Sequence, residues 1–322
     1  MGSLGVPGLE AVVQLAEVVR SGFVESRHFG IAVVLSPAGE VLCALGDVDG
    51  LVLPRSTAKP LQAVGSLVAG AKLDQRQTAV AAGSHTGEDQ HVLVVREILA
   101  SVDLGEDALE CPPDWPENEA ARFGLIQAFG GPERILMNCS GKHAAMLAAM
   151  VASGNGPAGY LSPGSYVQKV VAAELGRLTG HTASVVAGDG CGTPLYDVSL
   201  RGLARAFGRL AVASSGTPEG RVAAAMRAHP ELVGGTGHAN TEVMRLLPGF
   251  LAKGGAEGVL AMASPEGYSV ALKVIDGSPR ITTALALTLL STVGLDMTPA
   301  HSLTTVAVLS GGSPVGRIQP TV

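Results

Sequence analysis

Cysteine is scarce in this sequence, which holds four cysteines among 322 residues. So few thiols do not suggest a disulfide framework, and we expect a reduced, cytoplasmic protein. Long apolar runs are also missing, because glycine, serine or a charged residue interrupts each run before about 18 residues. The first residues lack the basic stretch and apolar core of a secretory signal. These absences exclude a predicted membrane span, and we expect no membrane partner.

Charged residues are few as well, at 16% of the chain, and they form no basic cluster. With a formal net charge of −6, the chain lacks the electrostatic footprint of nucleic-acid binding, so we expect no nucleic-acid partner. Hydrophobic residues, by contrast, make up 47% of a chain long enough to bury a sizeable core. This composition is typical of a compact soluble enzyme.

The apolar patterns along the chain predict its architecture. Strands are predicted at 28–36, 40–46, 259–263 and 269–275. Helices are predicted at 61–69, 74–81, 88–99, 144–152, 162–178, 199–214, 217–229, 241–247 and 281–295. Residues 9–20 fit either a helix or a strand, and residues from 306 onward are expected to be loosely extended. Strands at both ends with helices between them predict an α+β protein whose two ends share one antiparallel sheet.

We expect residues 1–322 to act as a single catalytic unit. Its sheet-containing part is expected at about 1–60 and 248–322, and its mainly helical part at about 61–247. No internal repeat and no low-complexity linker interrupts this organisation.

The stretch Leu53-Pro54-Arg55-Ser56-Thr57-Ala58-Lys59-Pro60 places a serine and a lysine three residues apart. If a helix begins near Arg55 or Ser56, positions i and i+3 share one face, so the hydroxyl of Ser56 and the amine of Lys59 can meet. A neutral lysine amine can take the proton of a serine and turn it into a nucleophile. Such a lysine needs burial or a nearby positive charge, so a second lysine from elsewhere in the chain is a useful partner.

Two other polar stretches are rich in glycine. Residues 82–88 form a loop in which Ser84 or Thr86 is expected to cap the following helix. Residues 187–194 form another, whose glycines permit positive φ or the close approach of a ligand. This second stretch lacks the Gly-Lys-Ser/Thr ending of a phosphate loop, so we do not expect it to bind a nucleotide phosphate.

The chemistry of the cysteines leaves three possibilities open. Cys139 and Lys142 lie three residues apart at a predicted helix start, so a thiolate and an amine can converge there. With Cys191 they allow a Cys139–Cys191 disulfide, two ordinary thiols, or a zinc site in which the lysine binds as the free amine. Cys43 and Cys111 are expected to be buried thiols, since neither has a partner at metal-ligand spacing.

Three polar signals follow one another along the chain. They are Ser56 with Lys59, Ser84 in its polar loop, and Lys253 in Lys-Gly-Gly-Ala-Glu-Gly at the start of a strand. In this order they resemble the penicillin-recognising serine enzymes. The middle motif is not Ser-Asp-Asn, and Gly254 stands where Thr or Ser is expected. Glutaminases of the same fold carry a similar Lys-x-Gly strand. The resemblance therefore implies a serine β-lactamase/glutaminase-like fold.

Over nearly its whole length the chain resembles more closely the Rhizobium-type, or class 3, L-asparaginases. The stretches that carry this resemblance are Pro-Arg-Ser-Thr-Ala-Lys-Pro-Leu-Gln-Ala (54–63), Ser-His-Thr-Gly-Glu-Asp-Gln-His (84–91), Cys-Ser-Gly-Lys-His (139–143), Gly-Asp-Gly-Cys-Gly-Thr-Pro (188–194) and Ala-Lys-Gly-Gly-Ala-Glu-Gly (252–258). The resemblance implies hydrolysis of L-asparagine to L-aspartate and ammonia by a homodimer.

The site residues follow from the same resemblance. It implies two serine–lysine pairs, Ser56 with Lys59 and Ser84 with Lys253. It also implies a zinc ion held by Cys139, Lys142 and Cys191, with Asp189 beside it. The residues that we expect to bind the substrate are Arg55, His85, Glu88, His143, Asp189 and Gly190.

Two other functions stay open at this point. A glutaminase or a β-lactam-recognising serine hydrolase would use the same fold, and assays with asparagine, glutamine and a β-lactam separate these activities. A catalytically weak homologue that binds a metal and an amino acid is also allowed. The sequence departs from similar proteins at His238 and Asn240, where Arg and Asp are expected.

Overall fold

The protein is described by a computed structural model over residues 5–322, and its contacts divide the chain into two units. Unit 1 contains the chain up to Thr57 together with Asp197–Val212 and Val243–Val322. Unit 2 contains Ala58–Tyr196 and Ala213–Glu242. The sheet-bearing unit is thus made from both ends of the chain and one short middle segment.

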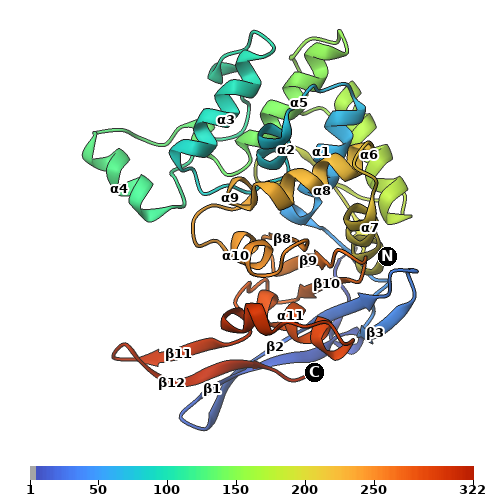
Figure 1. Ribbon diagram of the computed structural model, residues 1–322, viewed down its shortest axis with the longest axis vertical. Helices are drawn as coiled ribbons and strands as arrows, with labels where there is room; N and C mark the ends of the chain where they lie inside the picture. Colours follow the sequence, from blue (N-terminus) through green and yellow to red (C-terminus); the bar gives the residue numbers. More distant parts are fainter. Residues whose placement is uncertain (1–4) are drawn as a thin grey trace. The chain divides into compact units, whose positions relative to one another are not determined.

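Unit 1 is built on an antiparallel sheet with the strand order β11-β12-β1-β2-β10-β9-β8, and β3 also pairs with β2. Its strands are β1 (Val13–Arg20), β2 (Phe23–Leu35), β3 (Val41–Leu45), β8 (Leu251–Gly255), β9 (Val259–Ala263), β10 (Ser269–Val274), β11 (Val306–Ser310) and β12 (Ser313–Pro320). Figure 1 shows the blue N-terminal strands beside the orange and red C-terminal strands. The predicted α+β class, with one sheet shared by the two chain ends, is confirmed.

The end of the chain belongs to this sheet and is not loosely extended. β11 and β12 form a hairpin around Gly311 and Gly312, which both have positive φ. β12 pairs with β1 in a register that sets Ile318 opposite Val18. Residues 9–20, which the sequence pattern leaves open between helix and strand, mainly form β1, because that segment has strand partners on both sides.

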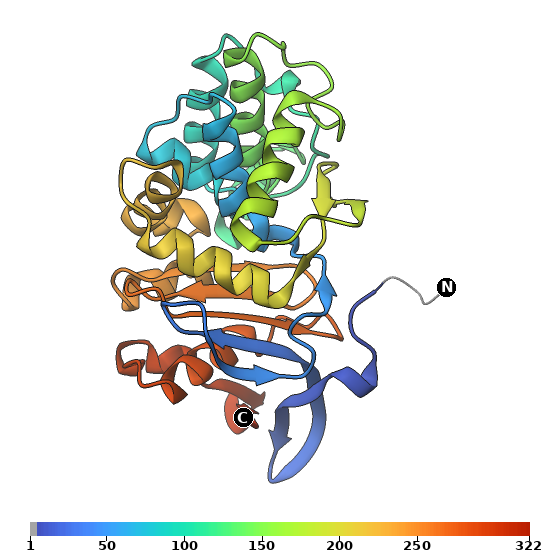
Figure 2. The same ribbon diagram turned by 90° about the vertical axis from the view of Figure 1, so that its right-hand side faces the viewer.

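One helix covers each face of the sheet in unit 1 (Figures 1 and 2). These helices are α7 (Leu200–Val212) and α11 (Thr282–Thr292), and both contact β9 and β10. α7 is amphipathic, since its apolar residues recur every three or four positions and Leu203, Phe207 and Leu210 are completely buried. Burying one such side chain stabilises the fold by about 1.5–3 kcal/mol.

Unit 2 is mainly helical. Its helices are α1 (Lys59–Val68), α2 (Gln75–Ala81), α3 (Asp89–Ala100), α4 (Glu119–Gln127), α5 (Ser140–Ala152), α6 (Tyr166–Thr179), α8 (Pro218–Ala228) and α9 (Pro230–Val233), while α10 (Ala239–Leu246) crosses the boundary between the units. α5 is the central helix, because it contacts α1, α2, α3 and α6 and all of its residues from Ser140 to Met150 are buried. A helix that is apolar on all sides needs neighbours on all sides, and α5 has them.

Some local expectations differ from the structure. Glu88, and not Ser84 or Thr86, occupies the position that caps α3, and its backbone N–H donates to His91 Nδ1 at 3.1 Å. Cys43 is half-buried rather than buried, because its strand β3 pairs with β2 alone.

α4 was not predicted from the sequence, and none of its residues is buried. Its short length gives too few apolar positions for a helical period to stand out. Over residues 5–322, no helix combines the length and the apolar character that crossing a bilayer requires.

Candidate active site

Ser56 lies in a 3-10 helix, η2 (Arg55–Ala58), which runs directly into α1 at Lys59. The predicted helix start near Arg55 or Ser56 is confirmed. Pro60 falls in the first turn of α1, where its missing N–H costs little. Arg55 has a φ of 50°, in the left-handed region that non-glycine residues adopt at a cost. Backbone strain of this kind next to Ser56 is typical of functional sites.

Within unit 1, β8 approaches the backbone of η2 closely at Gly255. A Cβ atom there would lie 3.1 Å from the backbone nitrogens of Ser56 and Thr57 and 3.2 Å from the carbonyl oxygen of Pro54. These separations are shorter than ordinary contacts, so the close approach requires a glycine. The backbone N–H of the predicted nucleophile therefore lies at the edge of β8.

Lys253 is completely buried in β8, opposite Ala261 of β9. Its Nζ donates to the carbonyl oxygen of Gly254 at 2.6 Å. Arg55 is only half-buried, and its Nη1 lies 3.9 Å from Glu257 Oε1. An ion pair of that length at the surface contributes little to stability. Among the basic site residues predicted in unit 1, Lys253 is therefore the buried one.

Lys59 and Ser84, both in unit 2, are hydrogen-bonded. Lys59 is completely buried, and its Nζ donates to Ser84 Oγ at 2.8 Å and to the carbonyl oxygen of Asn138 at 3.0 Å. The backbone N–H of Ser84 donates to the carbonyl oxygen of Val233 at 2.8 Å, which fixes the loop. A lysine ammonium has three N–H donors, whereas the neutral amine has two and a lone pair. Two of the Lys59 donors are therefore used on Ser84 and Asn138.

His85 is completely buried, and both of its ring nitrogens have protein partners. Nδ1 accepts from the Gly87 N–H at 3.2 Å, and Nε2 lies 2.8 Å from Ser140 Oγ. Because the Ser140 hydroxyl donates to the Ile135 carbonyl, it accepts from Nε2, and the ring is neutral. Burial lowers the pKa of His85, and the stacked His91 ring lowers it further. A substrate contact through His85 would have to replace one of these bonds.

The carboxylate of Glu88 is surrounded by donors from three segments of unit 2. Its donors are Thr86 Oγ1 at 2.9 Å, Gln90 Nε2 at 2.8 Å, Asn118 Nδ2 at 3.4 Å, and the backbone N–H and hydroxyl of Thr236 at 2.7 and 3.0 Å. Partial burial raises the pKa of Glu88, but these donors lower it overall. In the structure Glu88 therefore fixes the loop that carries Ser84.

The structure brings together the three predicted metal ligands, Cys139, Lys142 and Cys191, all of which are buried. Cys191 Sγ lies 3.3 Å from Thr193 Oγ1. Lys142 Nζ donates to Thr193 Oγ1 at 2.9 Å. Asp189 Oδ2 lies 3.6 Å from Lys142 Nζ and 3.9 Å from Cys191 Sγ. Two sulfurs, an amine and a carboxylate thus meet at one place in unit 2.

The charges in this cluster are distributed unevenly. The neighbouring Cys139 side chain lowers the pKa of Cys191 against the effect of burial, and the Lys142 ammonium lowers it further. The neighbouring Cys191 side chain and burial both raise the pKa of Cys139. Burial lowers the pKa of Lys142, but the neighbouring sulfurs and Asp189 raise it overall. The cluster therefore favours a thiolate beside the Lys142 ammonium.

A metal ion at this cluster would need Lys142 as a ligand. In the described part of the chain, no group of three or more His, Cys, Asp or Glu side chains is arranged to hold a metal. Two sulfurs and one nitrogen suit zinc and leave a fourth position for water or substrate. The donor set fits zinc once Lys142 gives up its proton, because only the free amine binds a metal.

The glycine-dense stretch that carries Asp189 is the turn of a hairpin between β5 (Val186–Gly188) and β6 (Pro194–Tyr196). Gly192 has a φ of 90°, which only glycine adopts freely. Asp189 Oδ1 accepts from the backbone N–H of Gly190 at 2.9 Å. This bond orients the carboxylate, whose other oxygen faces the amine and sulfur described above.

Asn138 is a residue that motif reasoning missed. Its carbonyl oxygen accepts from Lys59 Nζ, and its Oδ1 accepts from Cys139 Sγ at 3.1 Å. Its Nδ2 donates to Glu117 Oε1 at 2.6 Å. Asn138 therefore joins the serine–lysine pair of unit 2 to the sulfur cluster. Its place directly before the Cys-Ser-Gly-Lys-His stretch is the signal that could have identified it.

His143 and Tyr160 form a second contact beside the cluster. His143, expected to bind the substrate, is completely buried on α5, and its Nδ1 lies 2.6 Å from Tyr160 Oη. The two rings meet edge to face, with centroids 5.6 Å apart. Tyr160 stands in no recognisable motif, so the sequence carries no signal for it.

The two departures from the family pattern lie near the start of α10. The backbone N–H of Asn240 donates to His238 Nδ1 at 3.2 Å, and the Asn240 side chain is buried. The backbone N–H of Glu242 donates to the carbonyl oxygen of His238 at 3.0 Å. His238 and Asn240 thus shape the first turn of this helix.

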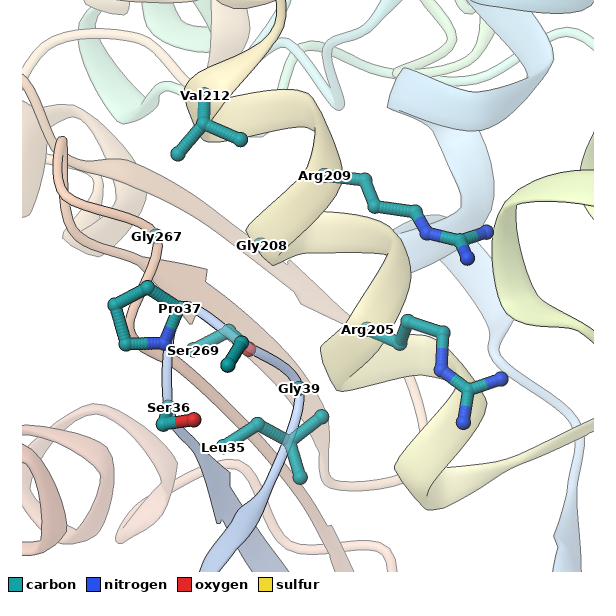
Figure 3. Close-up of a pocket in the computed structure, with 11 residues that line it drawn as sticks. Leu35, Ser36, Pro37, Gly39, Arg205, Gly208, Arg209, Val212, Gly267 and Ser269 are labelled. Atoms are coloured by element: carbon teal, nitrogen blue, oxygen red, sulfur yellow. The ribbon is translucent and has the colours of Figure 1, made fainter.

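A pocket of about 210 Å³ in unit 1 lies apart from these residues (Figure 3). It is bounded by residues 35–39 at the turn after β2, by α7 and by Gly267 and Ser269. Arg205 and Arg209 line it, but Figure 3 shows both guanidinium groups extending away from Pro37. None of the predicted site residues lines this pocket.

Comparison with protein families gives one match over most of the chain. The family described as L-asparaginase II matches residues 16–320. No curated protein matches the chain.

Several solved structures have a similar fold. Mglu in its tris and glutamate form is 14% identical, with 88% of this chain and 65% of that chain covered and a TM-score of 0.45. The β-lactamase Mb2281c from Mycobacterium bovis is 16% identical, with 83% and 95% covered and a TM-score of 0.44. A β-lactamase from Bacteroides dorei described as provisional is 15% identical, with 83% and 93% covered and a TM-score of 0.45. This chain spans less than two thirds of the length of Mglu in that form.

Proposed function

This chain belongs to the L-asparaginase II family, and we propose that it is an L-asparaginase that hydrolyses L-asparagine to L-aspartate and ammonia. The resemblance to an asparaginase family is confirmed, and membership of that family supports an amidohydrolase activity. The observation that carries the proposed chemistry is the hydrogen bond between the completely buried amine of Lys59 and the hydroxyl of Ser84. A buried amine bound to a serine is the arrangement that serine–lysine catalysis needs.

In the proposed mechanism Ser56 is the nucleophile and Lys59 its base. Ser56 Oγ attacks the side-chain amide carbon of asparagine, and its proton passes to Lys59 Nζ. The C–N bond of the amide then breaks, ammonia leaves with a proton from Lys59, and water hydrolyses the acyl-enzyme. The two acceptors hold Lys59 Nζ in a fixed position, as a base of this kind requires.

Ser84 and Lys253 are proposed to complete the catalytic group. Ser84 would pass protons, and the charge of Lys253 would oppose protonation of Lys59, since two neighbouring ammonium groups disfavour one another. Backbone N–H groups near Ser56 are proposed to stabilise the oxyanion. The close approach of Gly255 to the backbone nitrogens of Ser56 and Thr57 supports this assignment.

The proposed metal site consists of Cys139, Lys142 and Cys191, with Asp189 beside it. Their meeting in unit 2 supports a zinc ion there, although the same residues without metal are compatible with two ordinary thiols. A bound zinc ion would supply an open coordination position that orients the α-amino and carboxylate groups of the substrate. Elemental analysis of protein purified without added metal tests the site. We expect stoichiometric zinc in the wild type and none in Cys139→Ser or Cys191→Ser.

The decisive experiment measures ammonia release from asparagine and from glutamine, and ring opening of a chromogenic β-lactam, side by side. We expect asparagine to be the best substrate, Ser56→Ala to abolish its turnover, and a chelator to weaken its binding. Circular dichroism of Ser56→Ala should match the wild type, because losing one hydroxyl changes little volume. Near-normal turnover by the folded variant would move the nucleophile to Ser84. Faster turnover of glutamine would make the protein a glutaminase.

The remaining proposals concern the whole protein. The family resemblance supports a homodimer, which sedimentation at micromolar concentration can test. The four free cysteines support a reduced, cytoplasmic environment.

A further inference from the structure

Two buried histidines follow Ser84 in the sequence. His85 belongs to the loop of residues 82–88 (the Ser84 loop), and His91 lies in the first turn of α3. Both side chains are completely buried, and their rings stack with centroids 5.0 Å apart and planes 15° apart. Such a pair resists protonation, because each added charge would be removed from water and two added charges would repel one another.

The hydrogen bonds of His91 assign its proton. The backbone N–H of Glu88 donates to His91 Nδ1 at 3.1 Å, and a backbone N–H can only donate. His91 Nε2 lies 2.8 Å from the carbonyl oxygen of Glu231, which can only accept. The single proton of the neutral ring is therefore on Nε2. A second proton, on Nδ1, would face the N–H of Glu88 and break that bond.

His85 has the same arrangement. Its Nδ1 accepts from the N–H of Gly87, and its Nε2 donates to the hydroxyl of Ser140, whose own proton is used on the carbonyl oxygen of Ile135. The proton of this ring is therefore also on Nε2. The two Nδ1 atoms thus accept from the consecutive backbone N–H groups of residues 87 and 88. A second proton on either ring would set a donor against a donor at the end of the Ser84 loop.

The Ser84 loop in turn positions the serine–lysine pair of unit 2. The backbone N–H of His85 donates to the carbonyl oxygen of Asn138 at 3.2 Å, and the same oxygen accepts from Lys59 Nζ at 3.0 Å. Lys59 Nζ also donates to Ser84 Oγ at 2.8 Å. A shift of His85 therefore moves Ser84 directly and disturbs the acceptor that His85 shares with Lys59.

Charged groups from three segments face the two rings. Burial lowers the pKa of His85, and the His91 ring and then Lys59 on α1 lower it further. Burial also lowers the pKa of His91, while Glu88 of the Ser84 loop and Glu231 of α9 raise it without offsetting burial. On α5 the group that meets His85 is an uncharged hydroxyl. These surroundings favour two neutral rings, in agreement with the hydrogen bonds.

We propose that His85 and His91 are positioning residues that hold the Ser84 loop as neutral Nε2–H tautomers, and that a proton on either Nδ1 releases the loop. Neither ring is then available to bind the substrate, although His85 was expected to do so. A proton binds the released imidazole more tightly than the held one, so acid favours release. The consequence for catalysis rests on the proposed role of Ser84, whereas the tautomers and the release of the loop do not.

Nitrogen-15 NMR of the full-length protein labelled at histidine tests the tautomers. The signals of the two rings, assigned by their loss in His85→Asn and in His91→Gln, should show a protonated Nε2 and an unprotonated Nδ1 at about pH 7.5. A proton on Nδ1 of either ring at this pH overturns the proposal.

Hydrogen exchange tests the release of the Ser84 loop. The protection of the backbone amides of residues 84–88, corrected for the intrinsic exchange rate, should fall between about pH 7.5 and about pH 5.5. A released imidazole with a pKa of about 6.5 favours release about 10-fold over this interval, so two rings give about 100-fold. Glu88 does not contribute, because its lowered pKa matters only below its unfolded pKa of about 4.3. Protection that is the same at both pH values overturns the proposal.

Two glutamine variants separate His91 from a histidine beside the same segment. Glutamine at this position of a capping box accepts from the N–H at the start of the helix and does not titrate. His91→Gln should therefore keep its protection at about pH 7.5 and lose about 10-fold, not 100-fold, at about pH 5.5. His229 Nδ1 lies 3.4 Å from Glu231 Oε1, and His229→Gln should behave like the wild type. Equal losses in the wild type and His91→Gln would overturn the proposal.

Steady-state kinetics with asparagine separates positioning from substrate binding. His91→Leu removes the acceptor for the N–H of Glu88, so Ser84 is displaced and kcat should fall by up to about 100-fold at a KM near the wild-type value. His91→Gln should restore most of kcat. His85→Asn keeps an acceptor for the N–H of Gly87, so a raised KM with an unchanged kcat in this variant would make His85 a substrate-binding residue and overturn its assignment. A wild type without amidase activity would remove the proposed function and leave NMR and hydrogen exchange to decide the role of the two rings.

Discussion

Three buried lysines of the candidate site distinguish this protein at the scale of single residues. Lys59, Lys142 and Lys253 are almost completely buried, which is rare for lysine unless its charge is paired or its amine is neutral. Each has a specific acceptor: a serine hydroxyl, a threonine hydroxyl or a backbone carbonyl oxygen. Such an arrangement costs stability, so buried lysines are typical of sites where an amine takes part in chemistry.

Replacing Lys253 with methionine tests whether its charge acts on the base. In the proposed mechanism the charge opposes protonation of Lys59, so its removal lets Lys59 hold a proton more tightly. The rate should fall, and the acidic limb of the kcat/KM profile should move to higher pH. Lys253→Arg, which keeps the charge, should leave that limb in place. A profile of unchanged shape in folded Lys253→Met would contradict the coupling.

Glu88 gives a stability that depends on pH. Because hydrogen bonds lower its pKa in the folded protein, its contribution is complete above the unfolded pKa of about 4.3 and is lost as pH falls through the folded pKa. Glu88→Gln brings an amide NH₂ against existing donors, so it should destabilise the protein by about 1–2 kcal/mol at pH 7. The difference should shrink below about pH 4. Urea unfolding at both pH values measures it.

The matched control for this prediction is Glu266→Gln. Glu266 is exposed in the turn between β9 and β10. Its replacement should change stability by less than about 0.5 kcal/mol at either pH. A Glu88→Gln variant that behaves like this control would show that the cluster of donors around Glu88 does not stabilise the loop.

At the scale of elements, α5 joins the packing of unit 2 to its chemistry. Its first turn carries Lys142 and His143, three and four residues after Cys139. The following part of α5 packs against α1, α2, α3 and α6. The close contact with α2 depends on Gly141, where a Cβ atom would lie 2.5 Å from the carbonyl oxygen of Val80. The position of α5, which carries part of the sulfur cluster, thus depends on the absence of a side chain at Gly141.

A pair of glycine substitutions tests this contact. Gly141→Ala should destabilise the protein by about 1–3 kcal/mol, because a backbone carbonyl cannot move aside as a flexible side chain can. It should also lower the zinc content, since α5 must shift. Gly124→Ala in α4 meets nothing within 4 Å and should stabilise its exposed helix by about 0.5–1 kcal/mol. Thermal unfolding of both variants measures the two changes in Tm. Equal changes in Tm would show that the contact at Gly141 does not limit the packing of α5.

Local signals in the sequence predicted the parts of the site that depend on neighbouring residues. The Ser-x-x-Lys spacing predicted the helix start at Ser56, and the glycines around Cys191 predicted a turn. The contact of Tyr160 with His143 could not be predicted, because Tyr160 stands in no recognisable motif and lies 17 positions away in the chain. The assigned roles of the predicted residues stay predictions until the variants are measured.

At the scale of the whole molecule, unit 1 depends on pairing between the two ends of the chain. β1 lies between β2, its neighbour in sequence, and β12, which ends at Pro320. The sequence predicted that both ends share a sheet, but the tail was expected to be loosely extended. Its strand character depends on a partner about 300 residues away, which a local pattern does not contain. The sheet of unit 1 is therefore complete only when its last strands have paired.

Shortening the side chain of Ile318 tests whether β12 unfolds together with the rest of unit 1. Ile318 is 3% exposed in β12 and lies opposite Val18, which is equally buried in β1. Ile318→Ala should destabilise the protein by about 2–4 kcal/mol, because a buried cavity adds to the lost transfer free energy. Leu309→Ala, at a position of β11 that is 54% exposed, should cost less than about 0.5 kcal/mol. Urea unfolding followed by far-UV circular dichroism measures both variants. An Ile318→Ala midpoint equal to that of Leu309→Ala would show that the last strand opens before unit 1 unfolds.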